Sequence, residues 1–189
     1  MTRIAVMALQ GAFAEHEQVL RRLGAETFQV RQLSDWQQPK DGVVLPGGES
    51  TVQVRLLREL GLLEPVRSAI AGGLPVLATC AGLILLAKEE QGQPRQGLCT
   101  MDIDVCRNAY GRQLGSFNAQ GRIEHVAEQF PMTFIRAPYV RKLRSPNVEV
   151  LSRVDGRIVG VRQLNQIAVA FHPELTPDNR LHSFFLKLC

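Results

Sequence analysis

The feature that most constrains the fold is a run of 20 residues, from 68 to 87, without a single charged side chain. A run of this length is long enough to cross a bilayer as one helix. However, Gly72, Gly73 and Pro75 interrupt its first half, and Gly82 lies just after Cys80. These breakers favour a turn, a buried strand over residues 74–79, a tight turn and a buried helix over residues 81–89. We therefore reject a membrane span and expect these elements inside a folded domain.

The preceding residues repeat this order of short apolar strand, turn and helix. Strands are predicted over residues 3–9, 27–30 and 42–45, with a helix between the first two. Another helix follows the third strand, because apolar residues recur at helical spacing from 52 to 60. Ser50 and Gln53 match a capping box at its start. Strands that alternate with helices predict a parallel sheet covered on both faces.

The second half of the chain has a different pattern. Residues 101–106 alternate between apolar and polar, which predicts a strand with one face in water. Further strands are expected over residues 133–136, 148–151, 158–163 and 167–171, with Asp155-Gly156 as a hairpin turn. Residues 179–188 are expected to form a closing helix. The predicted fold is one α/β domain over residues 1–189, a three-layer, doubly wound, flavodoxin-like fold with a mostly parallel sheet and late antiparallel strands.

Composition narrows the possible functions. The net charge is +4, but the basic residues are scattered and form no recognisable nucleic-acid module, so we favour a solvated surface. The four cysteines and four histidines show no metal-ligand spacing, and no metal or cofactor is expected. The first apolar run is too short for a secretory signal. Reduced thiols in the cytoplasm are therefore the expectation.

Cys80 lies where a buried strand is predicted to turn directly into a helix. The neighbours Thr79, Ala81 and Gly82 are small, as a strained strand-to-helix turn requires. The free N–H groups and the positive dipole at the helix N-terminus favour a thiolate there. The N–H of Ala81 is also placed to stabilise an oxyanion. A buried structural cysteine is the alternative, and the strand-to-helix position favours a nucleophile.

His172 and Glu174 supply a base and a carboxylate at the end of a predicted strand. Pro173 lies between them and favours extended geometry at His172. Residues two apart in an extended chain point to the same side, so Glu174 is expected beside the imidazole. Cys80, His172 and Glu174 then form a plausible catalytic triad. A surface turn would explain the His-Pro-Glu sequence alone equally well.

The segment PGGEST, residues 46–51, follows the third strand and opens a helix. Its two glycines allow backbone N–H groups to approach a ligand or an oxyanion closely. The lysine and the spacing of a Walker loop are missing. The simpler interpretation is a tight turn with Ser50 as the helix cap, and both interpretations are compatible.

These segments carry a family resemblance. PGGEST, TCAG at residues 79–82 and HPE at residues 172–174 resemble the three blocks of the triad-type, class I glutamine amidotransferases. LQGA at residues 9–12, Arg107-Asn108 with GRQ at residues 111–113, FIRAP at residues 134–138 and FHPELT at residues 171–176 resemble the glutaminase subunits of two-component pyridoxal 5′-phosphate synthases. The similarity runs from residue 4 to about residue 176. Ala78 departs from the family's usual glycine, but it is small enough for the turn.

The resemblance implies roles for individual residues in glutamine hydrolysis and a partner that receives the ammonia. It implies Cys80 as the nucleophile, His172 and Glu174 as its relay, and Gly48 with Ala81 as the oxyanion site. It also implies a set of residues that line the pocket for L-glutamine: Gly48, Glu49, Ser50, Arg107, Ile135 and Arg136. Ammonia would pass to a pyridoxal 5′-phosphate synthase subunit in a hetero-oligomeric complex, and the family pattern implies that the isolated chain is poorly active. The alternatives are a glutaminase subunit of another pathway and a non-catalytic redox or binding module built on Cys80.

Overall fold

In the computed structural model, which describes residues 1–107 and 115–189, the short apolar runs form a parallel sheet. Its central strands lie in the order β2-β1-β3-β4-β13, and each is parallel to its neighbours. They are β1 (Arg3–Met7), β2 (Glu26–Val30), β3 (Gly42–Leu45), β4 (Val76–Thr79) and β13 (Gln166–Val169). β3 matches the predicted range, and the other strands differ from the predicted ranges only at their ends. The predicted flavodoxin-like α/β fold is confirmed.

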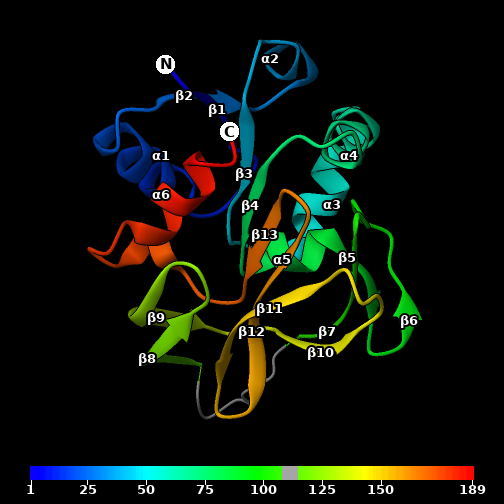
Figure 1. The fold of residues 1–189 in the computed structure, drawn as a ribbon. Coiled ribbons are helices and arrows are strands. Elements are labelled where there is room, and N and C mark those ends of the chain that lie inside the picture. Colours follow the sequence, from blue (N-terminus) through cyan, green and yellow to red (C-terminus); the bar gives the residue numbers. More distant parts are fainter. Residues whose placement is uncertain (108–114) are drawn as a thin grey trace.

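Helices cover both faces of this sheet, as Figure 1 shows. The blue and red helices α1 (Phe13–Arg22) and α6 (Arg180–Leu186) lie on one face. The cyan helices α3 (Ser50–Glu59) and α4 (Leu63–Ala71) lie on the other. The molecule therefore has the three layers expected from the alternating pattern.

The two layers of core follow from the two-residue repeat of a strand. In β1, Ile4 and Val6 pack into the cluster that contains Leu20 of α1 and Phe185 of α6. Ala5 and Met7 belong to the cluster on the opposite face, which includes α3 and α4 side chains. Each central strand is thus buried on both faces, which explains its continuous apolar sequence.

A set of later strands extends the sheet beyond β13, mostly in antiparallel pairs. β11 (Glu149–Val154) pairs with β12, and β8 (Ser116–Ile123) forms a separate two-stranded sheet with β9 (Ala127–Ile135). The other added strands are β12 (Arg157–Gln163), β10 (Tyr139–Leu143), β7 (Met101–Cys106), β5 (Ala87–Glu90) and β6 (Gln93–Pro94). The prediction of late antiparallel strands is confirmed.

The predicted hairpin turn between β11 and β12 is confirmed. Asp155 and Gly156 both have positive φ, 50° and 77°. A tight two-residue turn of this kind needs positive φ at both central positions, which aspartate and glycine tolerate. The strands on either side pair in antiparallel fashion.

The predicted helix over residues 81–89 is wrong in its second half. α5 (Ala81–Leu86) ends after six residues, and Ala87 is extended. The chain then enters β5, where Ala87 pairs with Met101 and Glu89 with Asp104 of β7. Pairing with a strand distant in sequence overrides the local helical preference here.

Two local predictions are corrected as well. The N-cap of α3 is Glu49, whose carboxylate accepts from the N–H groups of Thr51 and Val52; Ser50 lies one residue inside the helix. In β7, Asp104 does not face water but is fully buried, where it pairs with Arg141 of β10. An ion pair with Arg141, whose side chain is 46% exposed, compensates the buried carboxylate, which is why the alternating pattern was misleading at this position.

Several elements were not predicted. They include α2 (Leu33–Trp36), α4, β10, most of the β8–β9 ribbon and a 3-10 turn, η1 (Pro173–Leu175). Among residues 1–107 and 115–189, no helix is both long and apolar enough to cross a membrane.

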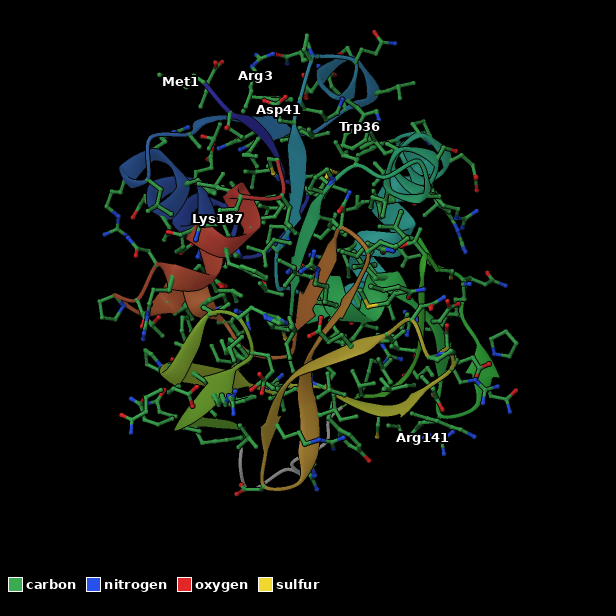
Figure 2. The ribbon with its side chains drawn as sticks, viewed as in Figure 1. Met1, Arg3, Trp36, Asp41, Arg141 and Lys187 are labelled. Carbon is green, nitrogen blue, oxygen red and sulfur yellow. The ribbon has the colours of Figure 1, made fainter. Side chains whose placement is uncertain are left out.

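The parallel strands all begin at the same end of the molecule. In Figure 2, Arg3 and Asp41 lie close together at the upper end, beside Trp36, and the backbone N–H of Arg3 donates to Asp41 at 2.8 Å. Arg3 begins β1, and Asp41 directly precedes β3. Arg141, on the added strand β10, lies at the lower end of the same view. The carboxyl ends of the central strands therefore point towards the part of the molecule where the added strands begin.

Candidate active site

The segments singled out in the sequence follow the carboxyl ends of neighbouring strands. Gln10 follows β1, Gly47 follows β3, Cys80 follows β4 and His172 follows β13. The strand order reverses between β1 and β3, which is the place where open α/β sheets bind ligands. The parallel arrangement thus brings residues from four separate parts of the chain to one edge.

Cys80 occupies the strained turn that its small neighbours predict. Its φ is 49° and its ψ is −103°, a conformation that non-glycine residues rarely adopt. The Cys80 N–H donates to the Val169 carbonyl of β13 at 2.8 Å, which anchors the turn to the sheet. Gly82 is required for the close approach of α5 to β3, because a Cβ there would lie 2.2 Å from the Leu45 carbonyl oxygen.

The thiol of Cys80 faces His172. The side chains of Cys80 and His172 are within hydrogen-bonding contact, and Cys80 Sγ lies 3.8 Å from the Ile135 carbonyl oxygen. Cys80 is only 7% exposed, and His172 is 6% exposed. The sulfur therefore lies in a confined place with a base beside it.

Glu174 holds the other side of the imidazole. His172 Nδ1 lies 2.6 Å from Glu174 Oε1, and the carboxylate is fully buried. The predicted neighbourhood is correct, but the predicted extended geometry is wrong: residues 173–175 form η1, a 3-10 turn, and His172 has a ψ of 86°. The His172 N–H donates to the Thr133 carbonyl of β9 at 2.8 Å, so the late ribbon helps fix the position of the histidine.

The protonation of His172 is set by its two partners. Burial alone lowers its pKa, but hydrogen bonds with Cys80 and Glu174 outweigh burial and raise the pKa to about 10. Burial also opposes ionisation of Glu174, yet the neighbouring His16 and His172 bring the pKa of this carboxyl below its usual value. The geometry therefore favours an imidazolium held between a carboxylate and a sulfur.

The glycine turn after β3 is fixed by side chains on three sides. Gly47 N–H donates to Thr79 Oγ1 at 3.1 Å, and Glu49 N–H donates to Gln10 Oε1 at 2.7 Å. Gln53 Nε2 donates to the Pro46 carbonyl at 3.2 Å. The turn passes so close to the imidazole that a Cβ on Gly47 would lie 2.4 Å from His172 Cε1. Only glycine leaves room for this contact.

A pocket of about 540 Å³ opens above Cys80. Cys80 and His172 line this pocket, and Glu174 lies behind them. All the predicted pocket and oxyanion residues line it as well: Gly48, Glu49, Ser50, Ala81, Arg107, Ile135 and Arg136. The structure therefore brings together every site residue named from the sequence. Of the motif that begins at Arg107, Asn108 and residues 111–113 lie outside the described part of the chain.

Two charged side chains of this pocket are held in defined states. Arg107 donates from Nη1 to Ser50 Oγ at 3.3 Å and from Nε to Glu90 Oε1 at 2.5 Å. A hydrogen bond from the Thr51 hydroxyl, with lesser contributions from backbone N–H groups and Arg107, lowers the pKa of Glu49. An oriented guanidinium and an ionised carboxylate can bind the two charged ends of an amino acid.

Sequence reasoning missed two features of the site. His16 on α1 is fully buried and lies 3.3 Å from Glu174, although nothing in its local sequence distinguishes it from a core residue of an amphipathic helix. Glu90 holds Arg107 from β5, just after a segment that was predicted to be helical. No group of three or more possible metal ligands occurs within residues 1–107 and 115–189.

Comparison with known proteins identifies the family. The chain matches the SNO glutamine amidotransferase family over residues 6–189. The chain belongs to this family. The resemblance seen in the sequence is thereby confirmed, and with it the prediction of a glutamine amidotransferase.

Individual relatives are similar to this chain over nearly their whole length. The pyridoxal 5′-phosphate synthase subunit PdxT of Methanocorpusculum labreanum is 54% identical over 187 residues, which cover 98% of this chain and 97% of the relative. The protein of the same name from Desulfitobacterium hafniense is 52% identical over 184 residues, which cover 97% of this chain and 92% of the relative.

Solved structures are also similar to this chain. A crystal structure of a glutamine amidotransferase has a TM-score of 0.91 and 44% identity, and covers 98% of this chain and 97% of its own. A second glutamine amidotransferase, from Thermotoga maritima, has a TM-score of 0.66 at 13% identity, with coverage of 98% and 83%. The second likeness shows only the shared fold.

Proposed function

We propose that this SNO-family chain acts as one glutaminase domain that hydrolyses L-glutamine to L-glutamate and ammonia through Cys80, His172 and Glu174. The observation that carries the proposal is the placement of a buried Cys-His-Glu set at the floor of a pocket with oriented ionic groups. In this arrangement each side chain meets the next, as a nucleophile, a base and an orienting carboxylate require.

Glutamine binds with its side-chain amide towards Cys80. Arg107 and Arg136 attract the α-carboxylate, since a guanidinium reads a carboxylate with paired donors. The ionised Glu49 attracts the α-ammonium group. Ser50 and Ile135 line the space between these charged groups.

The reaction proceeds in two steps through a thioester. The Cys80 thiolate attacks the amide carbon of the side chain, and the N–H groups of Gly48 and Ala81 donate to the oxyanion. The imidazolium of His172 gives its proton to the departing nitrogen, ammonia leaves, and a γ-glutamyl thioester remains. Water then attacks this carbon while His172 takes its proton; the C–S bond breaks, and glutamate and the thiolate are released.

We further infer that the ammonia passes to a pyridoxal 5′-phosphate synthase subunit in a hetero-oligomeric complex. Both relatives described above, each of which shares more than half of its aligned residues with this chain, carry the name of a subunit of that enzyme. Ammonia released into water would be protonated and lost as a nucleophile, so a glutaminase of this kind needs an acceptor at hand. The four cysteines are all free thiols, which fits a cytoplasmic location.

The test of this function is the replacement Cys80→Ala, measured as glutamate production with the synthase subunit present. We expect turnover to vanish and the fold to persist, because alanine fits the same small turn. The matched control replaces Cys99, Cys106 and Cys189 together by serine and is expected to retain most of the activity. Substantial turnover by Cys80→Ala would rule out Cys80 as the nucleophile.

A further inference from the structure

A chain of buried ionisable side chains continues from the triad into the core. On the side away from His172, Glu174 Oε2 lies 3.3 Å from Nε2 of His16 on α1. His16 Nδ1 lies 2.9 Å from Nε2 of His182 on α6. Both histidines are 0% exposed, and neither lines the glutamine pocket. Two buried histidines are costly in an apolar core unless their polar atoms are used.

The hydrogen-bonding capacity of these groups determines which nitrogen carries each proton. A carboxylate only accepts, so His16 Nε2 must be protonated to face Glu174 favourably. The neutral ring then has a bare Nδ1, which accepts from His182 Nε2–H at 2.9 Å. The opposite assignment would place a nitrogen lone pair against the carboxylate. It would also leave an N–H at His182 Nδ1, for which the described residues offer no partner.

His16 Nε2–H lies near two acceptors, of which Thr79 Oγ1 forms the hydrogen bond and Glu174 Oε2 makes only a close electrostatic contact. Besides Glu174, it lies 3.2 Å from Thr79 Oγ1, which also accepts from the Gly47 N–H of the glycine turn. Glu174 Oε2 forms no hydrogen bond among the described residues, and its contact with His16 Nε2 at 3.3 Å is an electrostatic one. His16 therefore presents an N–H dipole to this oxygen while Glu174 Oε1 faces His172.

We propose that His16, oriented by His182, is a positioning residue that fixes the Glu174 carboxylate against the catalytic His172. This inference rests on the triad proposed above. His16, Glu174 and His182 lie on α1, η1 and α6. The helical layer opposite α3 and α4 therefore takes part in setting the geometry of the active site.

A neutral donor suits this role better than a charged one. Burial lowers the pKa of His16, and His172 acts in the same direction, while Glu174 and Glu15 oppose it. Burial, with His16 and Arg22, brings the pKa of His182 well below its usual value. A neutral imidazole orients the carboxylate without cancelling its charge, so that the charge remains available to the His172 imidazolium. A lysine or arginine at this position would compete with His172 for it.

The test compares two amide replacements of His16 that differ in where they place their nitrogen. The amide nitrogen of His16→Gln reaches approximately the position of Nε2, whereas that of His16→Asn reaches only the position of Nδ1. With the synthase subunit present, we expect His16→Asn to lower kcat by about 10-fold or more, and His16→Gln to stay within about 3-fold of the parent. KM for glutamine should not change, because His16 lies outside the pocket. In His16→Asn, the acid limb of the pH profile should move to higher pH, since the ionised Glu174 loses the N–H dipole that faces it.

Two controls separate this effect from a loss of stability and from a failure of the triad itself. Ser152→Ala removes the hydrogen bond of another buried residue, from Ser152 Oγ to the Arg122 carbonyl, and should leave kcat and its pH profile unchanged. Glu174→Gln should lower kcat by about 10²- to 10⁴-fold. If Glu174→Gln is fully active, the proposed triad is wrong. If Glu174→Gln is impaired while His16→Asn has the parent's kcat and pH profile, only the positioning role is wrong.

A measurement independent of activity tests the same assignment. Nitrogen NMR of histidine side chains at neutral pH should show His16 and His182 as neutral rings, both protonated at Nε2 and bare at Nδ1. The replacement His182→Leu should disturb the His16 signals, because His16 Nδ1 loses its donor. Observation of a charged His16, or of a proton on its Nδ1, would overturn the proposal even if the variants failed to fold.

Discussion

Three neighbouring residues of this protein carry backbone strain or buried charge, and each is explained by the presence of the others. Cys80 adopts positive φ, His172 is buried yet has a raised pKa, and Glu174 is buried yet ionised. Each would be costly alone, because strain and buried charge both oppose folding. As neighbours, each charged group compensates the next. These catalytic candidates could be recognised in the sequence because Cys80 and His172 each follow a predicted strand.

The raised pKa of His172 predicts how stability depends on pH. Its protonated form is favoured in the folded state, so the associated stability is fully present below the ordinary pKa of 6.5 and is lost as pH rises through about 10. The free energy of unfolding of the parent, measured by urea titration, should therefore fall over this range. His172→Gln lacks the titrating group and should show a smaller fall. Equal pH dependence in the two proteins would mean that His172 gains no such stabilisation on folding.

At the scale of helices and strands, what could be predicted depended on how local the signal is. The buried strands β3 and β4 and the Asp155-Gly156 turn are encoded in a few consecutive residues. The end of α5 was missed because Ala87–Glu90 becomes a strand only by pairing with β7. The Asp104–Arg141 pair and the contact between His16 and Glu174 join distant segments, so no local pattern reveals them.

The turn after β3 provides a test of how closely one element constrains another. In Gly47→Ala the added methyl would meet His172 Cε1 at 2.4 Å, so the imidazole or the turn must shift. We expect kcat to fall by about 10²-fold, the loss that a displacement of about 1 Å can cause. Gly115→Ala adds its methyl where no atom of residues 1–107 and 115–189 lies within 4 Å, and it should keep the parent's rate. Full activity of Gly47→Ala would show that this close contact does not set the catalytic geometry.

At the scale of the whole molecule, the ends of the parallel strands bring the site residues together, and the helical layers pack behind them. Gln10, which lines the pocket, and Gln53, which lies beneath it, hold the turn that offers the Gly48 N–H. Both side chains are neutral. Polar contacts of this kind can be rearranged by a partner that docks over the pocket. A 100-fold change in rate needs only about 2.7 kcal/mol of difference between two arrangements of the turn.

This predicts that the glutaminase is activated by its synthase partner. At saturating glutamine, the rate of glutamate production should rise by at least about 10-fold when the synthase subunit is added, a difference of about 1.4 kcal/mol. Gln10→Ala removes the acceptor of the Glu49 N–H and should reduce this activation. Equal rates with and without the synthase subunit would contradict the gating of the turn and leave the triad unaffected.

The central claim is that Cys80 forms a covalent intermediate with glutamine, and covalent capture tests it most directly. The protein, with the synthase subunit present, is treated with an electrophilic glutamine analogue that carries a diazoketone in place of the side-chain amide, and its peptides are analysed by mass spectrometry. The account predicts one label per chain, on the peptide with Cys80, with protection by glutamine and no label in Cys80→Ala. Labelling of Cys99, Cys106 or Cys189 instead, or loss of activity without a label on Cys80, would contradict it.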